Sequence, residues 1–257
     1  MSGLAAQVLR VRMTVAYDGS AFRGFAPQPG LTTVSGVLAG ALETVTRDRV
    51  ELVCAGRTDA GVHAWGQVVS CDLPRSGLDL ARVQRSVNRL CGPGIVVRDI
   101  AEVAPGFSAR YSARSRTYRY TVLNRDVPDP FWASTSWWVR QTLDVHALML
   151  ACDPFIGEHD FSSFCKRDKG RDVKPPSLVR RVIDARWEDE GEGVLRLWIE
   201  ADSFCHQMVR SVVGTMVDAG RMRIHAGEIC DILRGKDRAR AGTLAPPHGL
   251  CLWKVSY

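Results

Sequence analysis

The feature that most constrains the fold of this 257-residue chain is an order of predicted elements that occurs twice. In the first half, alternation of apolar and polar residues or short apolar runs predict strands, and apolar residues at helical spacing predict helices. The strands are expected at residues 8–17, 51–55, 62–73 and 95–103, and the helices at 34–47 and 78–90. The order is β-α-β-β-α-β, which is that of ferredoxin-like folds.

The second half repeats this order. Strands are expected at residues 116–123, 179–187, 194–201 and 250–257, and helices at 143–155, 206–221 and 224–233. The acidic, glycine-containing segment 188–193 predicts a solvated hairpin turn. We therefore expect an α+β protein of two ferredoxin-like halves, residues 1–106 and 107–257, with antiparallel sheets. One face of such a sheet can stay open, and an open face suits RNA.

Composition and missing motifs exclude several classes of protein. A hydrophobic fraction of 46% and a net charge of +6 indicate a soluble globular chain rather than a disordered one. No apolar run of about 18 residues and no signal peptide is present, so we expect a cytoplasmic protein without a membrane span. The eight cysteines follow no zinc pattern, and P-loop, dinucleotide, G-x-S-x-G and H-E-x-x-H motifs are absent. We predict no metal site, and chemistry that depends on a nucleotide cofactor becomes less favoured.

The segment 56–64 combines one cation, one hydroxyl, one carboxylate and one imidazole between two predicted strands. These groups belong to Arg57, Thr58, Asp59 and His63, and glycines stand at positions 56 and 61. An isolated Gly-Arg-Thr-Asp would be better explained as a tight loop whose aspartate caps backbone N–H groups. The whole segment is too unusual for that explanation and indicates a functional site.

Gly56-Arg57-Thr58-Asp59-Ala60-Gly61-Val62-His63-Ala64 resembles the signature of the tRNA pseudouridine synthase A family. The resemblance covers nearly the whole chain in order. Its other motifs are Tyr17-Asp18-Gly19-Ser20, Gly66-Gln67-Val68-Val69, Phe107-Ser108-Ala109-Arg110, Tyr118-Arg119-Tyr120, His159-Asp160-Phe161, Met208-Val209-Arg210, Gly214-Thr215 and Ala245-Pro246-Pro247-His248-Gly249-Leu250. It implies the pseudouridine synthase fold, in which two ferredoxin-like halves form one continuous sheet.

The resemblance also implies an isomerase that converts uridine to pseudouridine at positions 38–40 of the tRNA anticodon arm. The N1–C1′ bond breaks, the uracil turns, and a C5–C1′ bond forms without cofactor or metal. Asp59 aligns with the catalytic aspartate of the family. An ionised carboxylate suits attack on C1′ or stabilisation of a cationic sugar, and it could alternatively remove a sugar proton. The sequence leaves these routes open.

Two further residues match catalytic residues of the family. Arg210 matches the arginine that pairs with the catalytic aspartate, and its apolar neighbours argue against a merely solvated helix residue. Tyr118 matches the active-site tyrosine, which can stack on uracil and help to remove the C5 proton. We expect Tyr118, Arg57, Thr58 and His63 to bind the substrate.

Basic residues gather in two segments. Residues 107–125 hold five arginines and three tyrosines without a carboxylate, and 165–181 is a basic insertion for which a solvated loop is a credible alternative. Interleaved cations and aromatics suit contact with phosphate and stacking on bases. The expected RNA contacts are Arg23, Arg110, Arg114, Arg116, Lys166 and Arg167.

The chain departs from the family pattern in one loop. Where the family usually carries Trp-Gln-x-Gln, this sequence has Phe25-Ala26-Pro27-Gln28, which bears on which uridines are modified. Family members are homodimers, so a homodimer on tRNA is expected. Two alternatives remain: a tRNA chaperone without catalysis on the same fold, and a hydrolase that cleaves the nucleoside bond. For the latter, no second carboxylate that would activate water is obvious.

Overall fold

A computed structural model describes residues 8–75, 77–167 and 177–257. The chain forms two compact units, Met1–Arg114 with Leu252–Tyr257, and Ser115–Cys251. The predicted boundary at residues 106 and 107 lies a few residues before the change from the first unit to the second. The closing residues of the chain belong to the first unit.

The first unit contains a sheet in which β1 (Val8–Tyr17) lies between β4 (Ile95–Glu102) and β3 (His63–Pro74), and β2 (Val53–Cys54) also pairs with β3. All these pairs are antiparallel. Every second residue of β1 is buried, from Leu9 to Tyr17, while the residues between them are partly exposed. The apolar face therefore packs into the core, and Arg10, Arg12, Thr14 and Ala16 lie on the other face.

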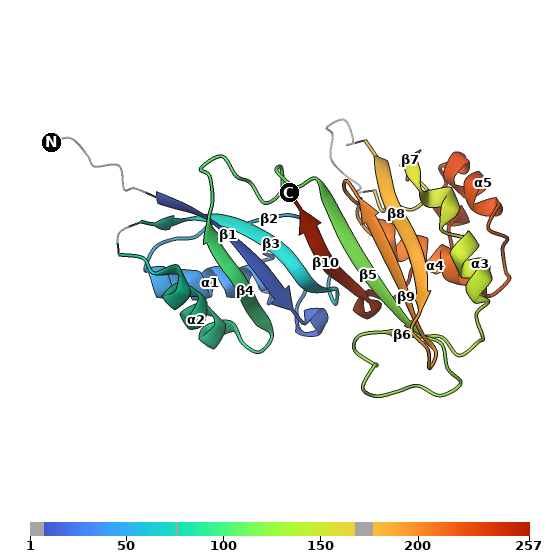
Figure 1. Cartoon of the computed structure of the whole chain (residues 1–257), viewed down its shortest axis with the longest axis horizontal. Helices are drawn as coiled ribbons and strands as arrows, with labels where there is room; N and C mark the ends of the chain where they lie inside the picture. Colours follow the sequence, from blue (N-terminus) through green and yellow to red (C-terminus); the bar gives the residue numbers. More distant parts are fainter. Residues whose placement is uncertain (1–7, 76, 168–176) are drawn as a thin grey trace. The chain divides into compact units, whose positions relative to one another are not determined.

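The helices of the first unit begin at capped positions. Thr33 accepts a hydrogen bond from the backbone N–H of Gly36 at the start of α1 (Val34–Thr46), and Asp79 does the same for α2 (Leu80–Cys91). Side-chain oxygens at these positions satisfy N–H groups that the helix leaves unpaired. The two helices contact each other and lie side by side in Figure 1.

The second unit has the strand order β5-β9-β8-β7, with all three pairs antiparallel, and the two-residue strand β6 parallel to β5. Its strands are β5 (Ser115–Leu123), β6 (Trp137–Trp138), β7 (Gly157–Asp160), β8 (Val179–Asp189) and β9 (Val194–Ala201). Its helices are α3 (Val145–Leu150), α4 (Met208–Gly220) and α5 (Glu228–Gly235), and β10 (Leu250–Ser256) follows. Single 3-10 turns occur at Gly19–Ala21, Asp153–Phe155, Arg238–Arg240 and Pro247–Gly249.

The predicted α+β class is confirmed. The first half has the β-α-β-β-α-β order, whereas the second half contains the additional short strands β6 and β7. The expected hairpin turn is present but shorter than 188–193, because Glu188 and Asp189 still pair as part of β8. The helix predicted at 143–155 is wrong in its length. It ends at Leu150, and a 3-10 turn with Pro154 follows, because a proline there would clash with the helical carbonyl four residues earlier. The helix predicted at 224–233 begins only at Glu228.

The cysteines behave as small interior residues. All eight are free thiols, and Cys71, Cys91, Cys152 and Cys165 are buried. Burial raises the pKa of Cys71 to about 12 and that of Cys152 to about 12, so both stay as unreactive thiols at neutral pH. Within the described ranges, no helix has both the length and the apolar character that crossing a bilayer requires.

Helix α4 packs so closely against the following segment that Gly214 has no space for a side chain. A Cβ at this position would lie 1.6 Å from the backbone oxygen of Thr243. We expect Gly214→Ala to lower the free energy of unfolding by about 3 kcal/mol, since backbone must move to accept the methyl group. Urea unfolding followed by circular dichroism measures this change.

Gly40 in α1 provides the matched control for this prediction, because nothing lies within 4 Å of a Cβ built there. Gly40→Ala should raise the free energy of unfolding by about 0.5–1 kcal/mol, because alanine loses less backbone conformational entropy than glycine when the helix forms. Equal effects of the two substitutions would show that α4 does not depend on the close approach.

Candidate active site

The loop between β2 and β3 is fixed at both of its ends. The N–H of Ala55 donates to the carbonyl of Val68 at 2.8 Å, and the side-chain amide of Gln67 donates to the carbonyl of Gly56 at 2.7 Å. The N–H of Val62 donates to the carbonyl of Asp59 at 3.2 Å, which closes a turn containing Gly61. Gly61 has φ +78°, a left-handed conformation that glycine adopts without strain. The sequence thus places Asp59 in a tight turn.

Thr58, the residue before Asp59, is anchored from two directions. Its hydroxyl lies 2.7 Å from the hydroxyl of Tyr17, and its carbonyl accepts the N–H of Phe25 at 3.1 Å. Thr58 is only 6% exposed, whereas Asp59 is partly exposed and Arg57 fully so. The backbone of the turn is therefore held by the protein, while Asp59 and Arg57 stay accessible to a substrate.

Phe25 belongs to the loop that departs from the family pattern. Its ring is 2% exposed and lies 6.2 Å from the ring of Tyr17, and its N–H holds Thr58. The neighbouring Gly24 has φ +94°, and a Cβ there would lie 3.0 Å from the carbonyl of Thr58. This atypical loop is thus a support of the turn that carries Asp59.

His63 connects the end of the turn to residues 18–19. Its Nδ1 accepts the N–H of Gly19 at 3.1 Å and lies 3.2 Å from a carboxylate oxygen of Asp18. Burial by itself would raise the pKa of Asp18, but hydrogen bonds from Ser20 and the nearby His63 hold that pKa below its usual value. His63 is buried, so its position indicates that it orients the loop.

The Tyr17–Thr58 hydrogen bond gives a direct test of how the turn is held. Tyr17→Phe should lower the free energy of unfolding by about 1–2 kcal/mol, because the buried Thr58 hydroxyl loses its partner. Thr58→Val should cost a similar amount, and the double variant should cost less than the sum by about 1 kcal/mol. Urea unfolding of the four proteins measures this coupling, and strictly additive effects would contradict the contact.

Tyr118 and Arg210 belong to the second unit, where they lie in β5 and α4. Tyr118 lies opposite Ile199 in the β5–β9 pair, is 7% exposed, and meets the ring of Phe204 edge-on with centroids 5.2 Å apart. Arg210 lies in the first turn of α4, and its Nε donates to the carbonyl of Ala245 at 2.7 Å. The carbonyl of Arg210 in turn accepts the N–H of Ala245 at 3.1 Å.

The closing motif of the resemblance supports Arg210 and its neighbour Tyr120. The Tyr120 hydroxyl donates to the carbonyl of Pro246 at 2.9 Å, and Gly249 lies against the Tyr120 ring, where a Cβ would have no space. Burial raises the pKa of Tyr120 well above its usual value, and the nearby charge of Arg210 opposes part of that rise. Arg210 is thus a partly buried cation held by backbone contacts.

The expected RNA contacts have different surroundings. Arg23, Arg110, Arg114, Lys166 and Arg167 are exposed. Arg116 is partly buried and donates to the carbonyl of Asp202 at 2.7 Å. Arg167 donates to the Ser162 hydroxyl at 3.2 Å. The greater part of the basic insertion, residues 168–176, lies outside the described residues.

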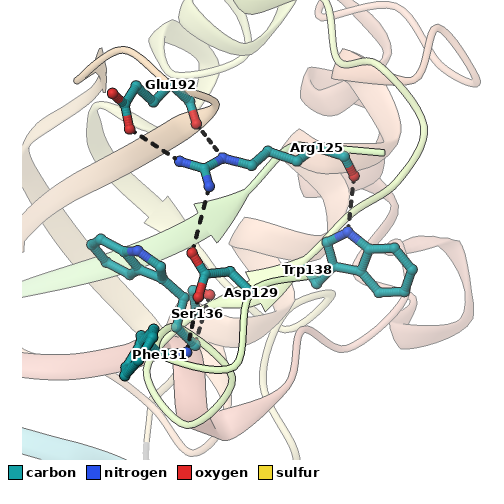
Figure 2. A network of polar contacts seen from close by, with 7 residues as sticks. Arg125, Asp129, Phe131, Ser136, Trp138 and Glu192 are labelled. Atoms are coloured by element: carbon teal, nitrogen blue, oxygen red, sulfur yellow. Dashed lines mark hydrogen bonds and ion pairs between the residues drawn. The ribbon is translucent and has the colours of Figure 1, made fainter. Parts of the chain in front are cut away.

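Protein groups also engage Arg125 and Arg119 of the basic segment 107–125. Figure 2 shows that Arg125 donates to the backbone carbonyl of Glu192 and pairs with Asp129 and with the Glu192 carboxylate, both at 3.5 Å. Trp138 donates its indole N–H to the carbonyl of Arg125 at 2.8 Å. The guanidinium of Arg119 lies 5.9 Å from the Trp198 ring, and its burial lowers its pKa. Arg125 therefore stabilises a loop. Although residues 107–125 contain no carboxylate, carboxylates from outside the segment pair with Arg125.

This chain of two α+β units is similar to pseudouridine synthases over nearly its whole length. A family model described as tRNA pseudouridine synthase matches residues 151–257. A tRNA pseudouridine synthase A of Moorella thermoacetica is 41% identical over 96% of this chain and 99% of its own length. Those of Bacillus subtilis and Leifsonia xyli are both 37% identical, over 97% and 98% of this chain and 99% and 92% of theirs. The chain belongs to the tRNA pseudouridine synthase A family.

Proposed function

We propose that this protein isomerises uridine to pseudouridine in the anticodon arm of tRNA, at positions 38–40. Its near full-length relatives carry the name of this activity. The observation that links the proposal to particular residues is the turn at Asp59. Tyr17, Phe25 and Gln67 hold this turn, and Asp59 is partly exposed. A fixed carboxylate beside an exposed arginine suits chemistry at the anomeric carbon of a nucleotide.

We assign Asp59 as the catalytic carboxylate, acting on C1′ as a nucleophile or on a sugar proton. The N1–C1′ electron pair leaves with the uracil, C5 then bonds C1′, and the C5 proton is lost as N1 gains one. Tyr118 stacks on the uracil and assists removal of the C5 proton. We assign to Arg210 the role of the family arginine that it matches, which pairs with the catalytic aspartate, because a nearby cation favours the charged form of a carboxylate.

Arg57 is exposed next to Asp59, so we assign it to the sugar or phosphate of the target nucleotide. Thr58 and His63 were expected to bind the substrate, but Tyr17 and the 18–19 turn engage the Thr58 hydroxyl and the His63 Nδ1. We therefore assign both to positioning the turn. A uridine inside a stem must be extruded to reach this site, at a cost of about a few kcal/mol.

We further propose that the protein acts as a cytoplasmic homodimer on tRNA. These statements rest on family membership, and the anticodon arm is expected to contact the exposed basic residues named above, which are Arg23, Arg110, Arg114, Lys166 and Arg167. The opposite signs of protein surface and phosphate backbone favour this placement.

One assay separates this function from its alternatives. tRNA carrying tritium at uracil C5 is incubated with the protein, released tritium is measured, and the nucleosides are analysed. A synthase releases tritium and leaves pseudouridine in the RNA. Free uracil with an abasic nucleotide would identify a hydrolase, and tRNA binding without turnover would identify a chaperone.

The affinity for tRNA should fall steeply as salt rises, because bound cations are released from each neutralised phosphate. Arg110→Ala should lower the magnitude of the log–log salt slope by about 1. Arg125→Gln is the control, since protein groups already engage Arg125, and it should leave the slope unchanged. Filter binding between low and high salt measures both, and a flat salt dependence of the wild-type protein would contradict phosphate contact.

A further inference from the structure

Trp65 is an exposed tryptophan on the strand that follows the catalytic turn. In the register of β1 and β3, Ala64 is the partner of Tyr17, and both are buried. Because side chains alternate along a strand, Trp65 points to the other face, away from the helices. It remains 45% exposed. The main core lies on the opposite face, and the buried cluster of Ala55, Val68 and Ala109 does not include Trp65, so neither explains so large an exposed aromatic.

Trp65 forms part of a row with two other side chains of the first unit. The guanidinium carbon of Arg98 on β4 lies 3.9 Å from the centroid of the Trp65 ring, and Arg98 also donates to the Trp65 carbonyl at 3.0 Å. On its other flank, Trp253 of β10 stacks with Trp65 at a centroid distance of 5.8 Å and an interplanar angle of 22°. We call Arg98, Trp65 and Trp253 the Trp65 row.

The backbones of β3 and β10 approach each other closely beside the Trp65 row. A Cβ at Gly66 would lie 2.3 Å from the carbonyl of Trp253, so only glycine allows the strands to meet here. Ala16 of β1 pairs with Val96 of β4, and its small side chain lies on the same face as Arg98 and Trp65. A small residue there leaves room for the long Arg98 side chain to cross β1.

The charge of the face also favours an RNA ligand. Arg12 on the same face pairs with Asp99 at 3.3 Å, so that carboxylate is neutralised locally. Arg98 stays exposed as a cation directly on the aromatic surface. A flat aromatic surface with a guanidinium stacked on it has the chemistry that binds a nucleobase and attracts its phosphate.

We propose that the Trp65 row is a stacking site for an unpaired nucleobase of the substrate RNA, next to the nucleotide that reacts. The proposal rests on the proposed function for the identity of the RNA. Trp65 is six positions after Asp59, so the two Cα atoms lie at most about 22 Å apart. A base on the Trp65 row is thus within a few nucleotides of the uridine that Asp59 reaches.

The test is equilibrium binding of a tRNA transcript and of a short oligouridine to the full chain. Trp65→Leu should weaken oligouridine binding by about 5- to 100-fold, because the apolar leucine lacks a stacking face. Trp65→Phe should stay within about threefold of wild type. The salt slope of tRNA binding should not change in either variant, since no phosphate contact is removed.

Phe131→Ala is the control for loss of an exposed aromatic, because Phe131 is 92% exposed in the second unit. It should bind both RNAs like the wild type. Thermal unfolding of each variant verifies the fold, and Trp253→Leu tests the row from a second position, with a loss of oligouridine binding like that of Trp65→Leu.

Wild-type affinity of folded Trp65→Leu for both RNAs would overturn the inference. An equal loss of RNA affinity in Phe131→Ala would also overturn it. So would a changed oligomeric state of Trp65→Leu with unchanged RNA affinity, because the Trp65 row would then be a protein contact. Because binding is measured without turnover, failure here leaves the proposed function intact. If the wild-type protein forms no pseudouridine while the Trp65 variants still lose RNA affinity, the proposed function is refuted and the stacking site stands.

Discussion

Asp59→Ala is expected to reduce pseudouridine formation by at least about 10³-fold while tRNA affinity stays within about threefold. Removal of a group that acts directly on the reacting carbon eliminates the chemical step, whereas phosphate contacts continue to hold the RNA. Asp59 is partly exposed and its backbone is held by neighbouring residues, so the fold should survive the change. Single-turnover tritium release and filter binding measure the two quantities.

Two comparisons sharpen the Asp59 experiment. Asp59→Asn keeps the size of the side chain but not its charge, and it should be as inactive as the alanine variant. Asp126→Ala removes an exposed aspartate from the second unit and should retain full activity. Normal single-turnover rates in the Asp59 variants would remove this residue from the catalytic step.

Arg210→Leu is expected to lower the single-turnover rate at neutral pH by about 10²- to 10³-fold. The arginine that Arg210 matches in the family pairs with the catalytic aspartate, so its loss removes a cation from the reacting centre. The affinity for tRNA should stay within about threefold of wild type. A loss confined to the single-turnover rate, in a variant that unfolds like the wild type, is not what a purely structural defect would cause.

Arg210→Lys separates charge from shape at this position. A lysine keeps the positive charge but cannot reproduce the planar guanidinium that bonds the Ala245 carbonyl, so intermediate activity is expected. Arg234→Leu is the control, because Arg234 is an exposed helix arginine paired with Asp231, and such surface pairs contribute little. A wild-type single-turnover rate in folded Arg210→Leu would show that Arg210 does not act in the catalytic step.

The regular elements were predictable because their periodicity is long and consistent. The alternation in β1 reflects a strand with one buried face. The apolar pattern of α4 reflects a helix that is buried almost all round. The strands β6 and β7 have two and four residues, too few to show a period, and were missed. Pro154 was present in the sequence, but its effect on the predicted helix 143–155 was not recognised.

The residue types of the candidate site were predictable, but the contacts that hold them were not. The loop 56–64 carries its chemical groups close together in the sequence, so the sequence alone indicates it as a candidate site. The Tyr17–Thr58 contact joins residues 41 positions apart, and the Arg125–Glu192 pair joins residues 67 positions apart. Such pairs depend on strand register and loop path, which local patterns do not specify.

The most direct test of the central claim is to map pseudouridine in a tRNA transcript after reaction with the wild-type protein and with Asp59→Asn. Pseudouridine keeps a carbodiimide adduct that stops reverse transcriptase, so each modified position appears as a stop. The account predicts stops within positions 38–40 of the anticodon arm with the wild-type protein and none with Asp59→Asn. An absence of stops with the wild-type protein, or the same stops with Asp59→Asn, would contradict it.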